Sequence, residues 1–122
     1  MKIKTANTIL YCKHWKETVA FYQDRLKLPV TALFGWFVEF ELNETSRLSI
    51  ADEARSSLDS CSGKGITITM EVDDIFAAQA FLNEAGIIPA KIKDHAWGAQ
   101  VIHVFDPEGN RIEFWSPESK AK

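Results

Sequence analysis

Apolar and polar residues alternate along several short stretches in the first half of the chain, as they do in half-buried strands. A helical spacing of apolar residues interrupts this alternation over residues 17–28. This helix is expected to end just before Pro29, because the residue before a proline is pushed out of the α conformation. Gly35 marks a bend or turn within a segment rich in Phe, Trp and Val. The stretches predicted as strands are residues 3–11, 31–42 and 47–51.

The same order of patterns starts again in the second half. Residues 66–72 alternate strictly, which is a strong signal for a half-buried strand. A helix capped by Asp73 or Asp74 is expected to follow and to end at Gly86. The remaining predicted segments are a strand at residues 87–92 and a loop at residues 95–98.

Two further strands, joined by the turn at residues 106–110, are predicted to close the chain as a hairpin. In the turn, Asp106 can bond back to nearby backbone and Gly109 can supply a positive φ. Antiparallel pairing then sets His103 opposite Glu113. Because side chains alternate along a strand, one face of the hairpin is apolar and the other is mixed. The apolar face holds Ile102, Val104, Ile112 and Phe114, and the mixed face holds Val101, His103, Arg111, Glu113 and Trp115.

An internal duplication is visible in the sequence. Residues 20–29 align with residues 80–89 at an offset of 60, and a strand, a helix and further strands surround both copies. Two βαβββ modules related by an approximate two-fold axis therefore share one domain, residues 1–122. Module one spans about residues 1–52, a linker spans about residues 53–64, and module two spans about residues 65–116.

Composition and charge narrow the classes of partner. The chain has 122 residues and a formal net charge of −3, and its basic residues are scattered, so nucleic acid is not the expected partner. No apolar run approaches the roughly 20 residues that span a bilayer, so no membrane association is expected. Cys12 and Cys61 lie far apart without a metal-ligand spacing. They are expected to be free thiols in a reducing cytoplasm, with no support for a disulfide.

The Phe21-Tyr22 helix of the first module and the Asp106-Pro107-Glu108-Gly109-Asn110-Arg111-Ile112-Glu113-Phe114 stretch of the second carry a family resemblance. Together with the duplication, they resemble the vicinal oxygen chelate superfamily, which contains glyoxalase I, bleomycin resistance proteins and extradiol dioxygenases. The resemblance covers almost the whole chain. It implies an α+β fold in which two βαβββ modules form curled mixed sheets around a cup-shaped cavity. It also implies a small-molecule ligand and a homodimer.

Metal-dependent members of this superfamily place one ligand on the first strand and one on the last strand of each module. Here those positions fall on Asn7, Ser49, Thr67 and Glu113, and only Glu113 matches the family pattern. Neutral oxygens are weak donors to a divalent ion beside a single carboxylate. The resemblance therefore implies no metal and no cofactor, as in the metal-free, antibiotic-binding branch. A shifted metal site that combines His103 and Glu113 with other residues stays open.

Several further side chains are candidates for contact with the ligand. His103 falls where fosfomycin-type relatives use a tyrosine to hold their substrate. It can equally be a structural partner of Glu113, since such cross-strand pairs contribute only about 0.2–1 kcal/mol. Trp97 and Trp115 are candidates for stacking on a planar ligand, although most aromatic residues at such positions belong to a core. The ligand-binding residues expected from the sequence are Asn7, Ser49, Thr67, Trp97, His103, Glu113 and Trp115.

Three functions are compatible with these features. The first is a cytoplasmic, metal-free binding protein that sequesters a small planar or amphipathic molecule, as in antibiotic resistance. The second is an enzyme, a lyase, isomerase or dioxygenase-like catalyst that uses a shifted metal site or acid–base chemistry of His103 and Glu113. The third is a catalytically silent module that works through protein contacts, for which residues 52–64 and the tail from Pro117 are the variable surfaces.

Overall fold

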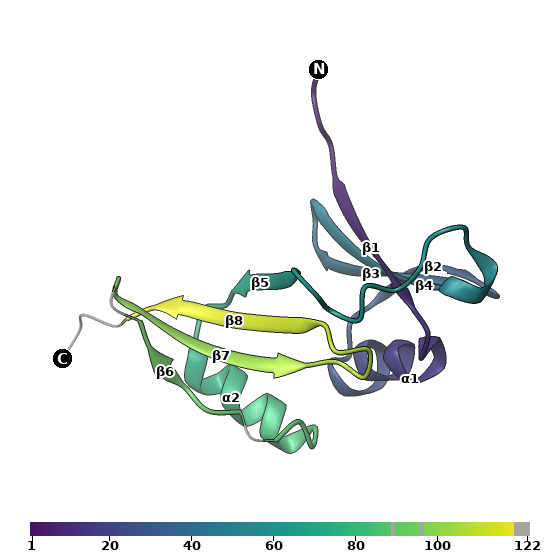
Figure 1. The fold of residues 1–122 in the computed structure, drawn as a ribbon. Helices are drawn as coiled ribbons and strands as arrows, with labels where there is room; N and C mark the ends of the chain where they lie inside the picture. The colour runs from purple at the N-terminus through teal and green to yellow at the C-terminus, as the bar shows by residue number, and fades with distance from the viewer. Residues whose placement is uncertain (89, 96, 119–122) are drawn as a thin grey trace.

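The computed structural model describes residues 1–88, 90–95 and 97–118, and the chain forms two βαβββ units in sequence (Figure 1). The first unit contains β1 (Ala6–Cys12), α1 (Trp15–Ala20), a π-helical turn (Phe21–Arg25), β2 (Val30–Phe34), β3 (Phe37–Asn43) and β4 (Ser46–Asp52). After a 3-10 turn at Glu53–Arg55, the second unit contains β5 (Thr67–Glu71), α2 (Ile75–Glu84), β6 (Lys93–Asp94), β7 (Ala99–Phe105) and β8 (Arg111–Pro117).

Each unit forms one four-stranded mixed sheet. The strand orders are β1-β4-β3-β2 and β5-β8-β7-β6, with the first pair of each sheet parallel and the other pairs antiparallel. This confirms the predicted α+β class with two mixed sheets. The helices α1 and α2 begin at Trp15 and Ile75, 60 residues apart, which matches the offset of the sequence duplication.

The closing hairpin has the register that its sequence predicts. His103 pairs with Glu113, and Val104 pairs with Ile112. Ile102 and Ile112 are fully buried, so the predicted apolar face lies in the core. Figure 1 shows α2 along one side of this sheet, and within the described ranges no helix covers the opposite side. The mixed face of the hairpin is therefore the open face of the second sheet.

Two predicted elements differ from the structure. The strand expected at residues 87–92 does not form among those of its residues that the structure describes, and Pro89 lies outside them. The segment instead packs as irregular chain over the core, with Ile87 and Ala90 buried and the Gln79 side chain donating to the Ala90 carbonyl at 2.8 Å. Ile87, Ile88 and Ile92 are of a residue type typical of strands, but here Ile87 is buried by irregular chain and Ile88 is exposed. The first helix begins earlier than expected and ends in the π-helical turn, before Lys27 adopts a positive φ of 57°.

One apolar core spans both units. Its fully buried side chains include Tyr22, Phe40 and Leu48 from the first unit and Leu82, Ile102 and Ile112 from the second. None of the helices in the described ranges is long and apolar enough to cross a membrane. The shared core means that the two units fold as one packed body.

The two cysteines are free thiols, as the sequence predicts. Burial is the main reason that the pKa of Cys12 is raised to about 12, with nearby Glu108 and Asp106 adding to the effect. Cys12 is therefore an inert core thiol at neutral pH. Cys61 is exposed and is the thiol that solutes can reach.

The turn of the closing hairpin joins the two units. The buried Asp106 carboxylate accepts hydrogen bonds from the hydroxyl of Tyr22 at 2.6 Å and from the backbone N–H of Asn110 at 2.9 Å. Glu108 accepts from the backbone N–H groups of Lys13 and His14, each at 2.8 Å, just before α1. The turn motif that carries the family resemblance therefore connects the second unit to the first.

The linker also packs against this turn. Gly63 has a φ of 79°, and a Cβ atom added there would lie 2.1 Å from the carbonyl oxygen of Gly109. Gly65 has a similar φ of 76°, but an added Cβ would meet no atom within 4 Å. Only the first position therefore requires glycine for space as well as for conformation.

Gly63→Ala is expected to destabilise the protein by about 1–3 kcal/mol more than Gly65→Ala, because only the first substitution overpacks a backbone contact. Both variants share the cost of an alanine at positive φ, so their difference isolates the clash. Urea unfolding of the two variants measures it. Equal losses in the two variants would show that the linker does not pack on the turn.

Candidate functional site

An imidazole and a carboxylate lie side by side on the open face of the second sheet. Strand β7 supplies His103 and β8 supplies Glu113, and their directly opposed positions bring His103 Nε2 within 2.9 Å of Glu113 Oε2. Each side chain keeps 20% of its surface exposed. The pair is therefore held in place by the sheet and remains within reach of a small molecule.

The Glu113 carboxylate is held ionised at neutral pH. Partial burial raises the pKa of Glu113. Hydrogen bonds from Thr69 and His103 and the charges of His103 and Arg111 outweigh this effect, so the pKa falls below the ordinary value of 4.5. The Thr69 hydroxyl donates to Oε1 from the adjacent strand β5. An ionised carboxylate of this kind can accept hydrogen bonds or bind a cation, and it is a poor general acid at neutral pH.

Arg111 places its cationic guanidinium beside the imidazole nitrogen that faces Glu113. Its Nη2 atom lies 2.8 Å from His103 Nε2, the nitrogen that also faces Glu113. One nitrogen cannot accept from a guanidinium and donate to a carboxylate at the same time. His103 therefore has two competing states, a lone pair directed at Arg111 or a proton directed at Glu113.

A second histidine, His95, joins this pair. One donor atom each of His95, His103 and Glu113 lies within 4.8 Å of the other two. The sequence indicated only that His95 lies in a loop, and it does follow the short strand β6 in the described structure. Its proximity to the pair follows from the β6–β7 pairing, for which a two-residue strand gives no periodic signal.

Two tryptophans form an aromatic wall beside the polar side chains. The rings of Trp97 and Trp115 meet edge to face with their centroids 5.6 Å apart, and the His95 ring lies 5.7 Å from that of Trp97. Trp97 is 66% exposed. The structure thus brings together four of the residues expected at the site, His103, Glu113, Trp97 and Trp115, on or beside one sheet face.

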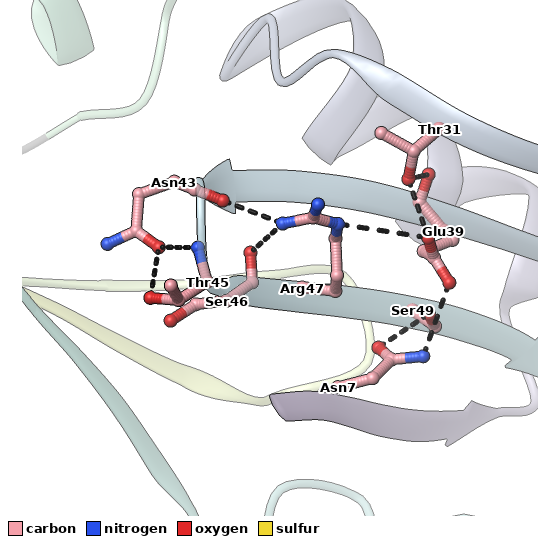
Figure 2. A network of polar contacts seen from close by, with 8 residues as sticks. All are labelled: Asn7, Thr31, Glu39, Asn43, Thr45, Ser46, Arg47 and Ser49. Carbon is pink, nitrogen blue, oxygen red and sulfur yellow. Dashed lines mark hydrogen bonds and ion pairs between the residues drawn. The ribbon is translucent and has the colours of Figure 1, made fainter. Parts of the chain in front are cut away.

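The first sheet carries its own polar network, centred on Glu39 (Figure 2). The Ser49 hydroxyl donates to Asn7 Oδ1 at 2.8 Å, and Asn7 Nδ2 donates to Glu39 at 3.5 Å. Glu39 also accepts from the Thr31 hydroxyl at 2.8 Å and lies 3.9 Å from Arg47 Nε. Asn7 and Ser49 are therefore neighbours, as their equivalent family positions imply, and Glu39 is a carboxylate that no sequence pattern singled out.

The two polar clusters occupy equivalent places in the duplicated units. The β3–β4 and β7–β8 hairpins share one register, offset by 64 residues. The equivalent pairs are Glu39 and His103, Arg47 and Arg111, and Ser49 and Glu113. Each sheet therefore presents an arginine beside a titratable group on β3 or β7, and the second sheet has the carboxylate of Glu113 where the first has Ser49.

The four positions that hold metal in related enzymes do not fit a metal here. Asn7 and Ser49 bond to each other on the first sheet, whereas Thr67 and Glu113 lie on the second. Hydrogen bonds among the described residues do not link these two sets, and the residue that bonds to Glu113 is Thr69, two positions beyond Thr67. Three neutral side chains on two sheets are not a ligand set for a divalent ion. A direct ligand contact of Asn7, Ser49 or Thr67 stays a prediction.

A groove of about 1140 Å³ runs beside the site. Apolar side chains of Phe21, Ile87 and Val104 line it, and so do His103 and Arg111. Its volume is comparable to that of pockets that take drug-sized molecules, about 300–1,000 Å³. A separate cavity of about 390 Å³ lies between α2 and strands β5 and β8, on the helix side of the sheet and away from the polar cluster.

Comparison with known proteins agrees with this fold. A family model described as a glyoxalase-like domain matches residues 5–118. The chain is 29% identical to the protein YraH of Bacillus subtilis (strain 168) over 119 residues, which cover 87% of this chain and 92% of YraH.

Solved structures show the same fold. A lactoylglutathione lyase from Agrobacterium tumefaciens superposes with a TM-score of 0.77 at 20% identity, over 95% of each chain. A glyoxalase/bleomycin resistance protein/dioxygenase from Nocardioides superposes with a TM-score of 0.78 at 19% identity, over all of this chain and 87% of the other. Since the family model spans nearly the whole sequence, the chain belongs to the glyoxalase-like domain family.

Proposed function

We propose that this protein binds a small planar or amphipathic molecule on the open face of its second sheet. His103 and Glu113 would orient the polar part of the molecule, and Trp97 and Trp115 would contact its planar part. The observation that carries this proposal is the placement of a partly exposed imidazole–carboxylate pair beside two tryptophans, the exposed Trp97 and the half-buried Trp115. Sites for small molecules combine apolar walls with a few such convergent polar groups.

The chemistry of the residues favours binding over catalysis at the family's usual position. Of the four residues there, only Glu113 is a carboxylate and none is a histidine, so we expect no metal at that position. The lowered pKa of Glu113 makes it a poor general acid at neutral pH. The buried Cys12, whose pKa is raised, is a poor nucleophile. Sequestration, as in the antibiotic-binding relatives, needs only shape, stacking and hydrogen bonds.

A second copy of the chain is the proposed partner. Within one chain the two polar clusters lie on different sheets, and hydrogen bonds among the described residues do not join them. The first sheet also exposes large apolar side chains on its strands, with Ile9 at 38%, Leu33 at 70% and Phe34 at 58%. A homodimer would cover such surface and set the first sheet of one copy near the second sheet of the other.

Native mass spectrometry of the protein purified from cells tests both proposals at once. The expected result is a mass of two 13.8 kDa chains with a bound small molecule. Glu113→Gln and Trp115→Ala are expected to lose the bound molecule and keep the dimer. Phe76→Ala, which removes an exposed aromatic ring from α2, is the matched control and should keep both. A bound molecule retained by Glu113→Gln would contradict the proposed site.

Metal-dependent catalysis at a shifted site is the second candidate function. The observation that favours it is His95, which supplies a further nitrogen donor beside His103 and Glu113. A lyase, isomerase or dioxygenase-like reaction would require an ion at these three side chains. That requirement can be examined independently of any organic substrate.

A further inference from the structure

Three donor side chains converge on the open face of the second sheet from three separate segments. His95 follows β6, His103 lies on β7 and Glu113 lies on β8, and one donor atom of each lies within 4.8 Å of the other two. We propose that His95, His103 and Glu113 together bind a single divalent transition-metal ion of the Zn²⁺ class. Of these three positions only Glu113 corresponds to a metal position of the related enzymes. The inference rests on the proposed location of the site and extends it.

The types of donor select the class of ion. Two imidazole nitrogens and one carboxylate oxygen suit Zn²⁺, Ni²⁺, Co²⁺ or Fe²⁺, whereas Ca²⁺ and Mg²⁺ prefer sets made of oxygen alone. Three protein ligands also leave at least one coordination position open. Because the three side chains lie where the small molecule is proposed to bind, an ion held by them would be available to an oxygen atom of that molecule.

The surrounding structure orients the side chain of one ligand, Glu113, and holds the backbone of another, His95. The Thr69 hydroxyl bonds to Glu113 Oε1, so the other oxygen, Oε2, is the one that faces His103. The turn that carries His95 is closed by its backbone N–H bonding to the Ala99 carbonyl at 2.8 Å and by its carbonyl accepting from the Gly98 N–H at 3.0 Å. A hydrogen bond to the side chain of the ligand, as from Thr69 to Glu113, is usual around metal ions.

The contacts of His103 Nε2 show which interactions a bound ion would replace. This nitrogen lies 2.9 Å from a carboxylate oxygen and 2.8 Å from the guanidinium of Arg111, and it can satisfy only one of them. A metal ion would accept lone pairs from Nε2 and from the carboxylate together, which resolves the conflict. Arg111 is exposed and competes for the same lone pair, so it must turn away when an ion binds.

Calorimetric titration with Zn²⁺ tests this inference, with the visible absorption of bound Co²⁺ as a second readout. The titrations use the full chain with Cys61→Ser, because an exposed thiol also binds such ions. We expect one ion per chain. His95→Gln and His103→Gln should each weaken binding by at least about tenfold.

The chain offers a matched control, because its third histidine, His14, lies before α1 and outside the cluster. His14→Gln should bind Zn²⁺ as the parent does. Arg111→Gln should bind it severalfold more tightly, since the competing guanidinium is gone. Circular dichroism of each variant confirms that it is folded.

Two results would overturn the inference: absence of micromolar Zn²⁺ binding by the parent, or unchanged binding in His95→Gln. If the parent fails to bind Zn²⁺ but still carries the small molecule in native mass spectra, the metal site is wrong and the proposed function stands. If it binds Zn²⁺ but no molecule, the proposed function is wrong and the metal site stands.

Discussion

Replacing Asp106 by alanine is expected to lower the free energy of unfolding by about 3–5 kcal/mol, the largest of the predicted effects on stability. The Asp106 carboxylate is 4% exposed and accepts four hydrogen bonds. Their donors are the Tyr22 hydroxyl at 2.6 Å and, at 2.9 Å each, the Glu108 N–H, the Asn110 N–H and the Asn110 side-chain amide. Removing the acceptor leaves buried donors without a partner, which costs their full desolvation.

Urea unfolding at neutral pH measures this loss. Asp59→Ala removes an exposed aspartate of the linker and should change the stability by no more than about 0.5 kcal/mol. Tyr22→Phe keeps the ring in the core and removes one hydrogen bond to the carboxylate, so it should cost about 1.5–3 kcal/mol. A loss below about 1 kcal/mol in Asp106→Ala would show that the turn does not join the two units.

Replacing Glu108 by glutamine is expected to cost about 2–3 kcal/mol at pH 7. The Glu108 side chain accepts from the backbone N–H groups of Lys13 and His14, at 2.8 Å each, and from the Ser60 hydroxyl. It thereby ties the hairpin turn to the start of α1 and to the linker. An amide has only one acceptor oxygen and lacks the charge, so these contacts are lost or weakened.

The cost of this substitution should also depend on pH. Burial raises the pKa of Glu108. The hydrogen bonds from Ser60, Lys13 and His14 and the charge of His14 outweigh this effect, so the pKa falls below the ordinary value of 4.5. A carboxylate with a lowered pKa stabilises the folded state above its unfolded pKa, and this contribution is lost as the pH falls through its folded pKa. The difference in stability between wild type and Glu108→Gln should therefore be largest at neutral pH and should shrink below pH 4.5.

Unfolding at pH 7, 5, 4 and 3 measures this dependence. Other carboxylates, Glu113 among them, titrate in both proteins and cancel in the difference. Glu84→Gln, at the exposed end of α2, is the matched control and should show a small difference at every pH. A difference for Glu108→Gln that stays constant from pH 7 to pH 3 would contradict the proposed role of its charge.

The parts of the fold that depend on local pattern could be predicted from the sequence. Two apolar-rich segments joined by a turn with Asp106 and Gly109 predicted the closing hairpin, including the opposition of His103 and Glu113. The cap at Asp74 and the end of α2 at Gly86 follow from equally local chemistry. The offset of 60 holds for the two helices, whereas the later strands are offset by 64, because the loops before them differ in length.

Contacts between distant segments could not be predicted in the same way. The hydrogen bond from Tyr22 to Asp106 joins residues 84 positions apart, and no pattern in the sequence predicts it. The same holds for His95, which reaches the site from the end of a two-residue strand. The β-branched residues at 87, 88 and 92 even favoured a wrong strand, because the sequence does not show that irregular chain packs there on the core.

The most direct test of the account is a crystal structure of the protein as purified from cells, with metal analysis of the same sample. We expect a bound molecule on the open face of the second sheet, within contact distance of His103 and Glu113 and against Trp115. A molecule bound instead within the Asn7–Glu39 network of the first sheet, or in the apolar cavity beneath α2, with the open face of the second sheet bare, would contradict it.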